Sequence, residues 1–471
     1  MPRILVIAEA GVNHNGSVAM ARDLVTAAAE AGADIVKFQS FKTSRLVTCH
    51  ARKAGYQAAR TRGSRTQREM LERLELPSDA WHNLIDLCAR KRIAFLSTPF
   101  DEESLRELVE DYRLPMLKIA SGEITNPLLL LPAARSGCRL ILSTGMATLA
   151  EVETALGIIA YGRATGGRAT RGHPTSADAP PSLEAFREAY RLAQAARPGP
   201  WPSWFSAAGF PATDPEADPP HSGLAADSGD MIPNALSVAS RSRSPGNAPH
   251  PTGMPSSSHR PGCRPPSRRR AGSPPLPDLR ARVAGPPARG ASPLPALTGL
   301  DGISLLHCTT EYPAPFAEVN LRAMDTLRAA FGLEVGLSDH TEGIAISLAA
   351  VARGATIIEK HFTLDRTLPG PDHQASLDPA GLRALVMGIR AVEAALGSSA
   401  KIPSEAEIHN MAVARKSLVA LRPIAKGAPY TPANLGAKRP GTGVSPLRYY
   451  EFLGRRAPRD LAADELVPDL P

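Results

Sequence analysis

The sequence predicts an α/β protein: a (β/α)8 TIM barrel followed by a small β-rich domain. Three observations support this fold class. Short runs of Val, Ile and Leu recur along the chain, as in buried parallel strands. Most of these runs end in polar side chains, and stretches with the helical period of apolar residues lie between them. Strand and helix alternating eight times favours a barrel over an open sheet, although the alternation does not show that the sheet closes.

The predicted strands begin almost at the first residue. Five of them lie in the first third of the chain, and the other three lie beyond residue 300. In order they are ILVIAEAG (4–11), DIVKFQS (34–40), IAFLSTPF (93–100), MLKIASGE (116–123), RLILSTGM (139–146), ISLLHC (303–308), EVGLSDH (334–340) and TIIEKHF (356–362). Predicted amphipathic helices cover residues 18–31, 80–91, 102–111, 147–160, 321–331, 344–353 and 379–396.

Two further segments explain why the chain of 471 residues exceeds one barrel of about 250 residues. We assign 1–197 and 301–400 to the barrel, and 412–471, with its Lys-Gly, Pro and Gly turns, to the small domain. Segment 198–300 holds 22 of the 45 prolines. Such a composition buries too little apolar surface to offset its ordering entropy, so we expect a disordered insertion between the fifth helix and the sixth strand. Segment 198–300 is either a genuine insertion or a sequence artefact such as a shifted reading frame.

Composition narrows the class of protein. The net charge is +8, and half of this excess lies in 198–300, where ten Arg face six Asp or Glu. Because no nucleic-acid-binding motif accompanies this charge, we do not expect nucleic acid as a partner.

The five cysteines form no C-x-x-C pair and suit a reducing compartment. No run approaches 18 apolar residues, so we expect a cytoplasmic protein without a membrane span.

Cations and hydroxyl groups follow four successive predicted strands. They are Lys37, Thr98, Lys118, Ser121 and Ser143. Charge-assisted bonds to phosphate are strong, and Lys supplies a compact point charge. A single such residue is often a solvated surface group or a cap, but five at successive strand ends are hard to explain in that way. The sequence therefore predicts a site for a phosphorylated carboxylate at the carboxyl end of the barrel.

Histidines and carboxylates end the other strands. His340 and His361 end the seventh and eighth strands, which are neighbours in a barrel, so their imidazoles can converge on one ion. A hydrogen-bonded structural role is the alternative for either histidine alone. Glu9, Glu359 and Asp372 offer general acid and base groups. For Glu9 the alternative is a strand-end carboxylate satisfied by backbone amides.

Eight motifs follow one another along the chain: AEAGVNHNG, VKFQS, STPF, KIASGEI, STGMAT, HCTTEYPAPFAEVNLRAM, GLSDHTEGI and EKHFTLDRTLPGPDHQASL. In this order they resemble the sialic acid synthase family, in particular bacterial N-acetylneuraminate synthases and their legionaminate relatives. The resemblance covers about residues 3–160 and 301–396. KRPGTG, near the end, resembles the antifreeze-like (SAF) domain of the family. Segment 198–300 is the departure from the family pattern.

The resemblance implies an enzyme that condenses phosphoenolpyruvate with N-acetylmannosamine and water to give N-acetylneuraminate and phosphate. A legionaminate-type synthase that uses 2,4-diacetamido-2,4,6-trideoxymannose is the nearest alternative. An inactive chain, or a scaffold that binds through its Arg-rich insertion, is the alternative from another class. The resemblance also implies a divalent metal, manganese or magnesium, and a domain-swapped homodimer.

Individual site residues follow from the same resemblance. Phosphoenolpyruvate is expected on Lys37, Thr98, Lys118, Ser121, Ser143, Thr310, Tyr312 and Ser338. The catalytic groups are expected at Glu9, Gln39, Glu359 and Asp372. The metal ligands are expected at His340 and His361, and the sugar contacts at Asp372 and Arg439.

Some of these roles are more specific. Among the carboxylates, Glu9 is the one expected to handle water. Thr310 stands where some family members carry Asn near the phosphate. Arg439 is expected to reach the N-acetyl group of the sugar in the site of the partner subunit. The Asn13-His14-Asn15 turn is expected in or beside the site, with His14 and His307 as orienting residues.

The position of the insertion leads to a first prediction. Helix-to-strand connections lie at the amino-terminal face of a barrel, opposite the chemistry. Lengthening a flexible loop costs only about 0.6 kcal/mol per doubling. Replacing 198–295 by a short Gly/Ser linker should therefore leave kcat and KM within about twofold and remove the main proteolysis site. Steady-state kinetics and limited proteolysis test this. Lost activity at an unchanged circular dichroism spectrum would assign the segment a part in function.

Overall fold

The computed structural model describes residues 3–61, 64, 66–166, 182–196 and 299–470. The expected disorder of 198–300 therefore falls almost wholly outside the described residues. The chain divides into two compact units, Met1–Leu396 and Gly397–Pro471. Each unit is described by itself.

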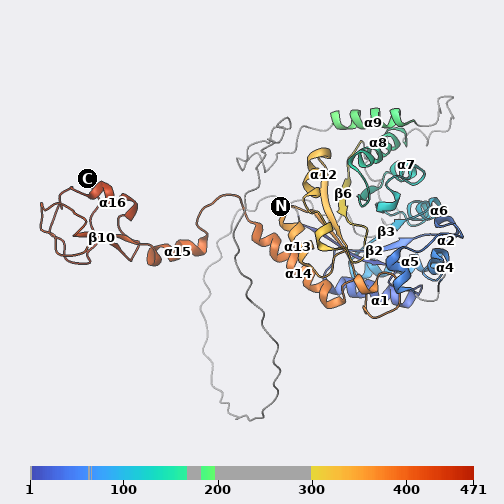
Figure 1. The fold of residues 1–471 in the computed structure, drawn as a ribbon, viewed down its shortest axis with the longest axis horizontal. Coiled ribbons are helices and arrows are strands. Elements are labelled where there is room, and N and C mark those ends of the chain that lie inside the picture. The colour runs from blue at the N-terminus through green and yellow to red at the C-terminus, as the bar shows by residue number, and fades with distance from the viewer. Residues whose placement is uncertain (1–2, 62–63, 65, 167–181, 197–298, 471) are drawn as a thin grey trace, which may run out of the picture. The chain divides into compact units, whose positions relative to one another are not determined.

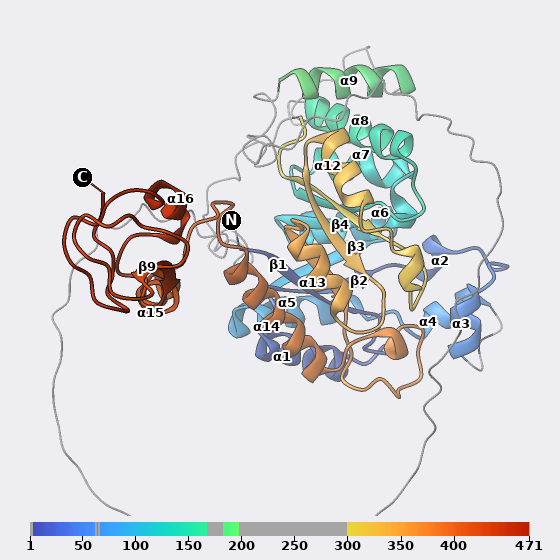
Figure 2. The same cartoon turned by 60° about the vertical axis from the view of Figure 1, so that its left-hand side comes forward.

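The first unit is a barrel of eight parallel strands, which confirms the predicted fold class (Figures 1 and 2). The strands pair in the order β3-β2-β1-β8-β7-β6-β5-β4. β3 and β4, at the two ends of this order, are in contact, which closes the sheet. The strands are β1 (Leu5–Gly11), β2 (Ile35–Ser40), β3 (Ala94–Pro99), β4 (Met116–Ile119), β5 (Arg139–Ser143), β6 (Ile303–Cys308), β7 (Glu334–Asp339) and β8 (Ile357–His361).

Helices surround this sheet (Figure 2). They are α1 (Val18–Ala31), α5 (Ser78–Lys91), α6 (Glu102–Arg106, continued by a π-helix over Glu107–Asp111), α7 (Pro127–Arg135), α8 (Leu149–Gly166), α9 (Leu183–Ala195), α12 (Ala323–Phe331), α13 (Ala345–Ala352) and α14 (Pro379–Leu396). One apolar cluster fills the layer between strands and helices. A second cluster lies inside the barrel and includes Ile7, Leu96, Ile141 and Leu306. Apolar side chains thus fill the interior of the barrel below the strand ends.

Helix α1 illustrates how the sequence sets these elements. It begins at Ser17, whose side chain accepts a hydrogen bond from the backbone N–H of Met20. It ends at Gly32, which has a φ of 84°, a left-handed conformation that costs glycine little. Between them, Leu24 and Val25 are buried on the face that packs on the sheet.

Three short helices lie between β2 and α5, where the sequence predicted no element. They are α2 (Thr43–Leu46), α3 (Gly55–Arg60) and α4 (Gln67–Glu72). Connections that follow a β-strand in a barrel lie at the carboxyl ends of the strands. This connection therefore contributes side chains to the same end of the barrel as the predicted chemistry.

The second unit is small and has a core of its own. It contains α15 (Glu405–Ala414), the antiparallel pair β9 (Ser417–Ala420) and β10 (Leu435–Lys438), and the short helix α16 (Tyr449–Phe452). Leu418, Tyr430 and Phe452 are buried in its apolar cluster.

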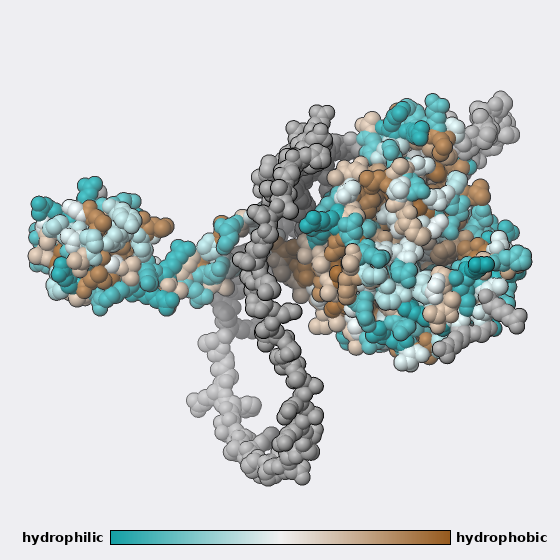
Figure 3. Space-filling model, in the orientation of Figure 1, coloured by the Kyte–Doolittle hydropathy of each residue, from teal (hydrophilic) through white to brown (hydrophobic). Residues whose placement is uncertain are grey.

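Nothing in the described part of the chain forms a helix that is both long enough and apolar enough to cross a membrane. On the face of the barrel unit seen in Figure 3, hydrophilic and hydrophobic residues are intermixed. Scattered apolar residues of this kind are normal on a protein surface.

Candidate active site

A cavity of about 340 Å³ opens at the carboxyl ends of the strands. Its lining includes thirteen of the fifteen predicted site residues: Glu9, Lys37, Gln39, Thr98, Lys118, Ser121, Ser143, Thr310, Tyr312, Ser338, His340, Glu359 and His361. All eight strands, or the residues directly after them, contribute a side chain to it. Asp372 and Arg439 are the two predicted residues that do not line it.

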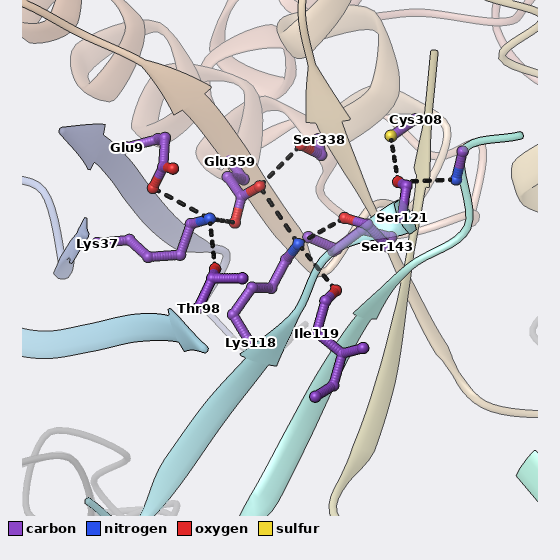
Figure 4. Close-up of polar contacts among 12 residues, drawn as sticks. Glu9, Lys37, Thr98, Lys118, Ile119, Ser121, Ser143, Cys308, Ser338 and Glu359 are labelled. Carbon is purple, nitrogen blue, oxygen red and sulfur yellow. Dashed lines mark hydrogen bonds and ion pairs between the residues drawn. The ribbon is translucent and has the colours of Figure 1, made fainter. Parts of the chain in front are cut away.

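The first buried cation in the cavity is Lys37 on β2. Its Nζ lies 3.0 Å from Oε2 of Glu9 and 3.4 Å from Oε2 of Glu359, and it donates a hydrogen bond of 3.2 Å to Thr98 Oγ1 (Figure 4). Glu9 Oε1 also accepts a hydrogen bond of 3.3 Å from the side-chain amide of Gln39. Lys37 is therefore held between two carboxylates from neighbouring strands.

The second buried cation is Lys118 on β4. Its Nζ donates to Ser143 Oγ at 2.6 Å and lies 3.6 Å from Oε1 of Glu359. Ser338 Oγ donates to the same oxygen of Glu359 at 2.8 Å. Figure 4 shows the ammonium groups of Lys37 and Lys118 on either side of the Glu359 carboxylate. Two cations and one shared anion thus form a buried row across the cavity.

The two carboxylates titrate very differently. Burial raises the pKa of Glu9 to about 7, against the lowering effect of Lys37. Burial would also raise the pKa of Glu359, but the charges of Lys118 and Lys37 outweigh it and lower that pKa to about 2. Near neutral pH, Glu359 is therefore a fixed anion, whereas Glu9 can exchange a proton. A group that titrates near the working pH is suited to general acid or base chemistry.

Small polar side chains pack closely around Gly145, next to Ser143 and Lys118. Ser121 Oγ accepts a hydrogen bond of 3.1 Å from the backbone N–H of Gly145 and lies 3.2 Å from Cys308 Sγ. A Cβ atom at Gly145 would lie only 2.4 Å from Thr310 Oγ1 and 2.8 Å from Ser121 Oγ. Only glycine fits at this position, because the neighbouring side chains leave no room for a Cβ atom. Backbone amide, hydroxyls and a nearby ammonium are groups that bind phosphate oxygens.

The two predicted metal ligands face the same cavity, with ring centroids 5.5 Å apart. The carbonyl of Thr309 accepts a hydrogen bond of 2.6 Å from His340 Nδ1, which leaves the lone pair of that ring on Nε2. His361 Nδ1 is buried without a hydrogen-bond partner. Burial lowers the pKa of His340 to about 4 and holds the pKa of His361 well below its usual range, so both rings are neutral near pH 7.

These two rings fit a divalent metal that keeps open coordination positions. Across the described residues, no cluster of three or more His, Cys, Asp or Glu side chains is arranged to hold a metal ion. A metal at this place would therefore take its remaining ligands from water or substrate.

Asp372 lies close to the cavity without lining it. Its carboxylate is buried, and its negative charge is among the causes that raise the pKa of Tyr56 and of Tyr312, both of which line the cavity. Arg439 lies in the second unit, where its Nε donates to the carbonyl of Ala414 at 3.0 Å. Its predicted contact with a sugar stays a prediction.

The two histidines expected to orient other groups lie outside the lining. His307 Nε2 lies 2.6 Å from the carbonyl of Val319, with which it shares a hydrogen bond. His14 accepts a hydrogen bond from the backbone N–H of Gly16 on its Nδ1. Each histidine therefore bonds to the backbone of a loop, and neither lines the cavity.

Several residues of the cavity escaped the sequence reasoning. They include Tyr56, Gln57, Gln67, Glu123 and Cys308. Tyr56, Gln57 and Gln67 belong to the connection between β2 and α5, which has no apolar run to mark it. Gly145, which does not line the cavity, lies in the polar end of the predicted strand 139–146, and its backbone N–H donates to Ser121.

The fold and the site together define the class: a TIM-barrel protein with a buried row of lysines at the carboxyl ends of its strands, suited to an anionic substrate. The chain belongs to the NeuB family, which it matches over residues 24–175 and 295–401. Residues 415–469 match the SAF domain. This confirms the resemblance to the sialic acid synthase family with its C-terminal SAF domain.

Similar proteins cover almost the whole chain. An N,N'-diacetyllegionaminic acid synthase of Campylobacter jejuni is 36% identical over 467 residues, which cover 99% of each protein. An N,N'-diacetyllegionaminic acid synthase of Legionella pneumophila is 34% identical and covers 97% of this chain and 91% of its own. The crystal structure of an N-acetylneuraminic acid synthetase from Leptospira borgpetersenii shares the fold, with a TM-score of 0.50 and 24% identity over 87% of this chain and 90% of that chain.

Proposed function

We propose that the protein condenses phosphoenolpyruvate with an acylamino sugar of the mannose type, with water, to give a nine-carbon 2-keto acid and inorganic phosphate. The row formed by Lys37, Glu359 and Lys118, with the hydroxyl groups beside it, is the observation that carries this proposal. Phosphoenolpyruvate is a small molecule with an anion at each end. The row offers one buried ammonium group for each end.

Each end of phosphoenolpyruvate has its own set of residues in this proposal. The phosphate lies against Lys118, Ser121 and Ser143, with Thr310 beside it. Its carboxylate lies against Lys37 and Thr98, near Ser338. These side chains are buried and mutually bonded, so their positions are set before the substrate enters.

The chemistry requires three proton transfers. C3 of phosphoenolpyruvate forms a bond to the aldehyde carbon of the open-chain sugar, and the aldehyde oxygen takes up a proton. The cation that results at C2 takes up water, which loses a proton, and the adduct then expels phosphate, which carries away the proton of the C2 hydroxyl group and leaves the 2-keto acid. We assign the removal of the water proton to Glu9, since its pKa of about 7 allows it to be ionised in the resting site and to hold a proton afterwards.

A divalent metal, manganese or magnesium, would be held by His340 and His361. When bound, it would polarise the aldehyde of the sugar as a Lewis acid. Tyr312 packs on both imidazoles, with ring centroids 4.1 Å from His340 and 5.4 Å from His361. This packing keeps the two rings facing the cavity.

Two observations favour a deoxy sugar such as 2,4-diacetamido-2,4,6-trideoxymannose over N-acetylmannosamine. The two relatives described above, both similar over almost the whole chain, are N,N'-diacetyllegionaminic acid synthases. One part of the cavity is also lined by apolar side chains: Phe41, Leu46, Val47, Leu71 and Phe100. A methyl group suits such a wall, whereas a hydroxyl group there would lose its hydrogen bonds to water.

An assay of phosphate release tests the proposal. The purified protein is expected to release phosphate from phosphoenolpyruvate only when a divalent metal and one of the two sugars are both present. A higher kcat/KM with the trideoxy sugar supports the legionaminate type, and a higher value with N-acetylmannosamine supports the sialic acid type. If phosphate is released with neither of the two sugars, although manganese and magnesium are present, the inactive or scaffold alternative is favoured.

Arg439 provides a prediction about assembly. A charge-assisted hydrogen bond to the sugar contributes about 1.5–3 kcal/mol. At about 1.4 kcal/mol per decade, Arg439→Ala should then lower kcat/KM for the sugar roughly 10- to 150-fold, with little change in KM for phosphoenolpyruvate. Steady-state kinetics with each substrate varied in turn measure this difference.

A mixing experiment tests the swapped homodimer that we propose. Arg439→Ala is mixed with Lys118→Ala, whose barrel site is disabled. If Arg439 acts in the site of the partner subunit, mixed dimers contain one intact site and recover part of the activity. Absence of any recovery, after exchange of subunits is verified, would mean that the site lies within one chain.

A further inference from the structure

The Asn13-His14-Asn15 turn after β1 has no place in the chemistry proposed above. None of its three side chains lines the cavity. Nevertheless Asn13 and His14 are each only 1% exposed. A buried polar turn that does not touch the cavity must have its hydrogen bonds elsewhere.

Those hydrogen bonds go to the loop that follows β8. Asn13 Nδ2 donates to the carbonyl of Phe362 at 2.8 Å and to Ser376 Oγ at 2.9 Å, so one amide joins the two ends of the loop. Asn15 Nδ2 donates to the carbonyl of Pro369, in the middle of the loop, at 3.0 Å. The turn therefore holds the loop at three points.

The contact at Ser376 leads directly to Asp372. Ser376 Oγ accepts from Asn13 and donates to the backbone carbonyl of Asp372 at 2.8 Å. The backbone N–H of Ala375 donates to the same carbonyl at 3.1 Å. Asn13, Ser376 and Asp372 thus form a continuous chain of hydrogen bonds that fixes the backbone of Asp372.

The residues on both sides of Asp372 are also held. His373 is fully buried, and its Nδ1 lies 2.7 Å from Thr363 Oγ1, with which it shares a hydrogen bond. Arg60 on α3 donates from Nη1 to the carbonyl of Pro371 at 3.1 Å. The residues directly before and after Asp372 are therefore held in place.

We propose that Asn13 and Ser376 are positioning residues, which fix the backbone of Asp372 so that its carboxylate meets the hydroxyl groups of the sugar. This inference rests on the proposed function, because it takes Asp372 as a sugar contact. It adds two residues outside the cavity to the determinants of sugar binding. A preorganised carboxylate binds the sugar without the entropic cost of ordering its loop.

Kinetics separate positioning from general stabilisation. Asn13→Ala and Ser376→Ala should each raise KM for the sugar about tenfold, as expected for the loss of an ordering hydrogen bond. KM for phosphoenolpyruvate should stay within about twofold, because its lysines lie on other strands. Ile159→Val, a core change on α8 far along the chain from this loop, serves as a destabilised control and should leave both KM values unchanged. An equal rise of both KM values in the Ser376→Ala variant would overturn the proposal.

A double-mutant cycle adds a sharper criterion. In an Asp372→Asn background, Ser376→Ala should cause little further rise in KM for the sugar, because its effect is transmitted through the Asp372 side chain. Effects that multiply independently would show that Ser376 acts by another route and would refute the inference.

The hydrogen bonds from Asn13 and Asn15 to the loop after β8 are called the clamp. Hydrogen exchange tests this clamp without any substrate. Asn13→Ala and Ser376→Ala should speed amide exchange in residues 363–377, while the strands of the barrel exchange as in the unmodified protein. Unchanged exchange in this loop would overturn the clamp whatever the enzyme turns over. If neither sugar is a substrate but exchange rises, the proposed function fails and the link to sugar binding fails with it, while the clamp itself stands.

Discussion

Replacing His361 by alanine is expected to reduce phosphate release more than 100-fold, beyond the 10- to 100-fold typical of residues that only support a metal ligand. The reason is that two imidazoles are the protein's whole contribution to the proposed site, so loss of one leaves a single ligand. Manganese binding, measured by calorimetry, should be lost in parallel. The thermal unfolding midpoint should change little, because His361 Nδ1 makes no hydrogen bond that the variant would lose.

His82 provides a matched control for this experiment. It is an exposed histidine on α5 that stacks edge-on against Tyr112, away from the cavity lining. His82→Ala should keep both activity and manganese binding. Full activity of the unmodified protein in a chelator, or an active His361→Ala variant, would remove the metal from the proposal.

Replacing Glu9 by glutamine is expected to lower kcat by about 10²- to 10⁴-fold, the usual contribution of a positioned general base. The change is nearly isosteric, so the cavity keeps its shape. It also has a signature in the pH dependence. Because the pKa of Glu9 is raised from 4.5 to about 7, the ionised form that can accept a proton accumulates only as pH rises through 7. In the unmodified enzyme, kcat/KM should therefore fall on the acid side of about pH 7.

The residual activity of Glu9→Gln should lack this acid limb. Gln39→Ala is the control, because it removes the neighbouring hydrogen bond to Glu9 but leaves the carboxyl group in place, so the limb should persist. An acid limb that survives unchanged in Glu9→Gln would assign the titration to another group, such as the substrate.

The strand ends were the most predictable part of the molecule. Runs such as RLILS reveal a buried parallel strand by composition, and a polar residue directly after such a run must lie at the carboxyl end of the barrel. This reasoning identified Lys37, Lys118 and Ser143 as neighbours in one cavity, although 81 residues separate the first two along the chain. Closure of the sheet was not readable, since it depends on contact between β3 and β4.

Helix α7 was missed because its sequence, PLLLLPAAR, lacks the usual signs of a helix. A run of four leucines hides the period, and Pro132 lies inside the helix, where proline is normally unfavourable. Pro127 at the first turn and Asn126, whose side chain accepts from the N–H of Leu128, mark the start of the helix in the structure. Here the local capping signal was present but the periodic signal was not.

The different behaviour of Glu9 and Glu359 could not have been inferred from sequence. Both follow apolar runs and both are glutamates. Their pKa values differ because Glu359 lies between two lysines, whereas Glu9 faces only Lys37. Such a difference depends on distances of a few ångströms across the barrel, which no local pattern records.

The row of buried lysines also determines which anions can compete for the site. Lys37 and Lys118 already have carboxylate partners within 4 Å, so the cavity has no uncompensated cation to offer to an incoming ion. A ligand enters by exchanging places with Glu9 and Glu359 as the counter-ion, and its affinity is the difference between two sets of ion pairs. A singly charged ion such as chloride gains little from this exchange. A molecule with an anion at each end can contact both lysines at once, so we expect the cavity to favour dianions over singly charged ions.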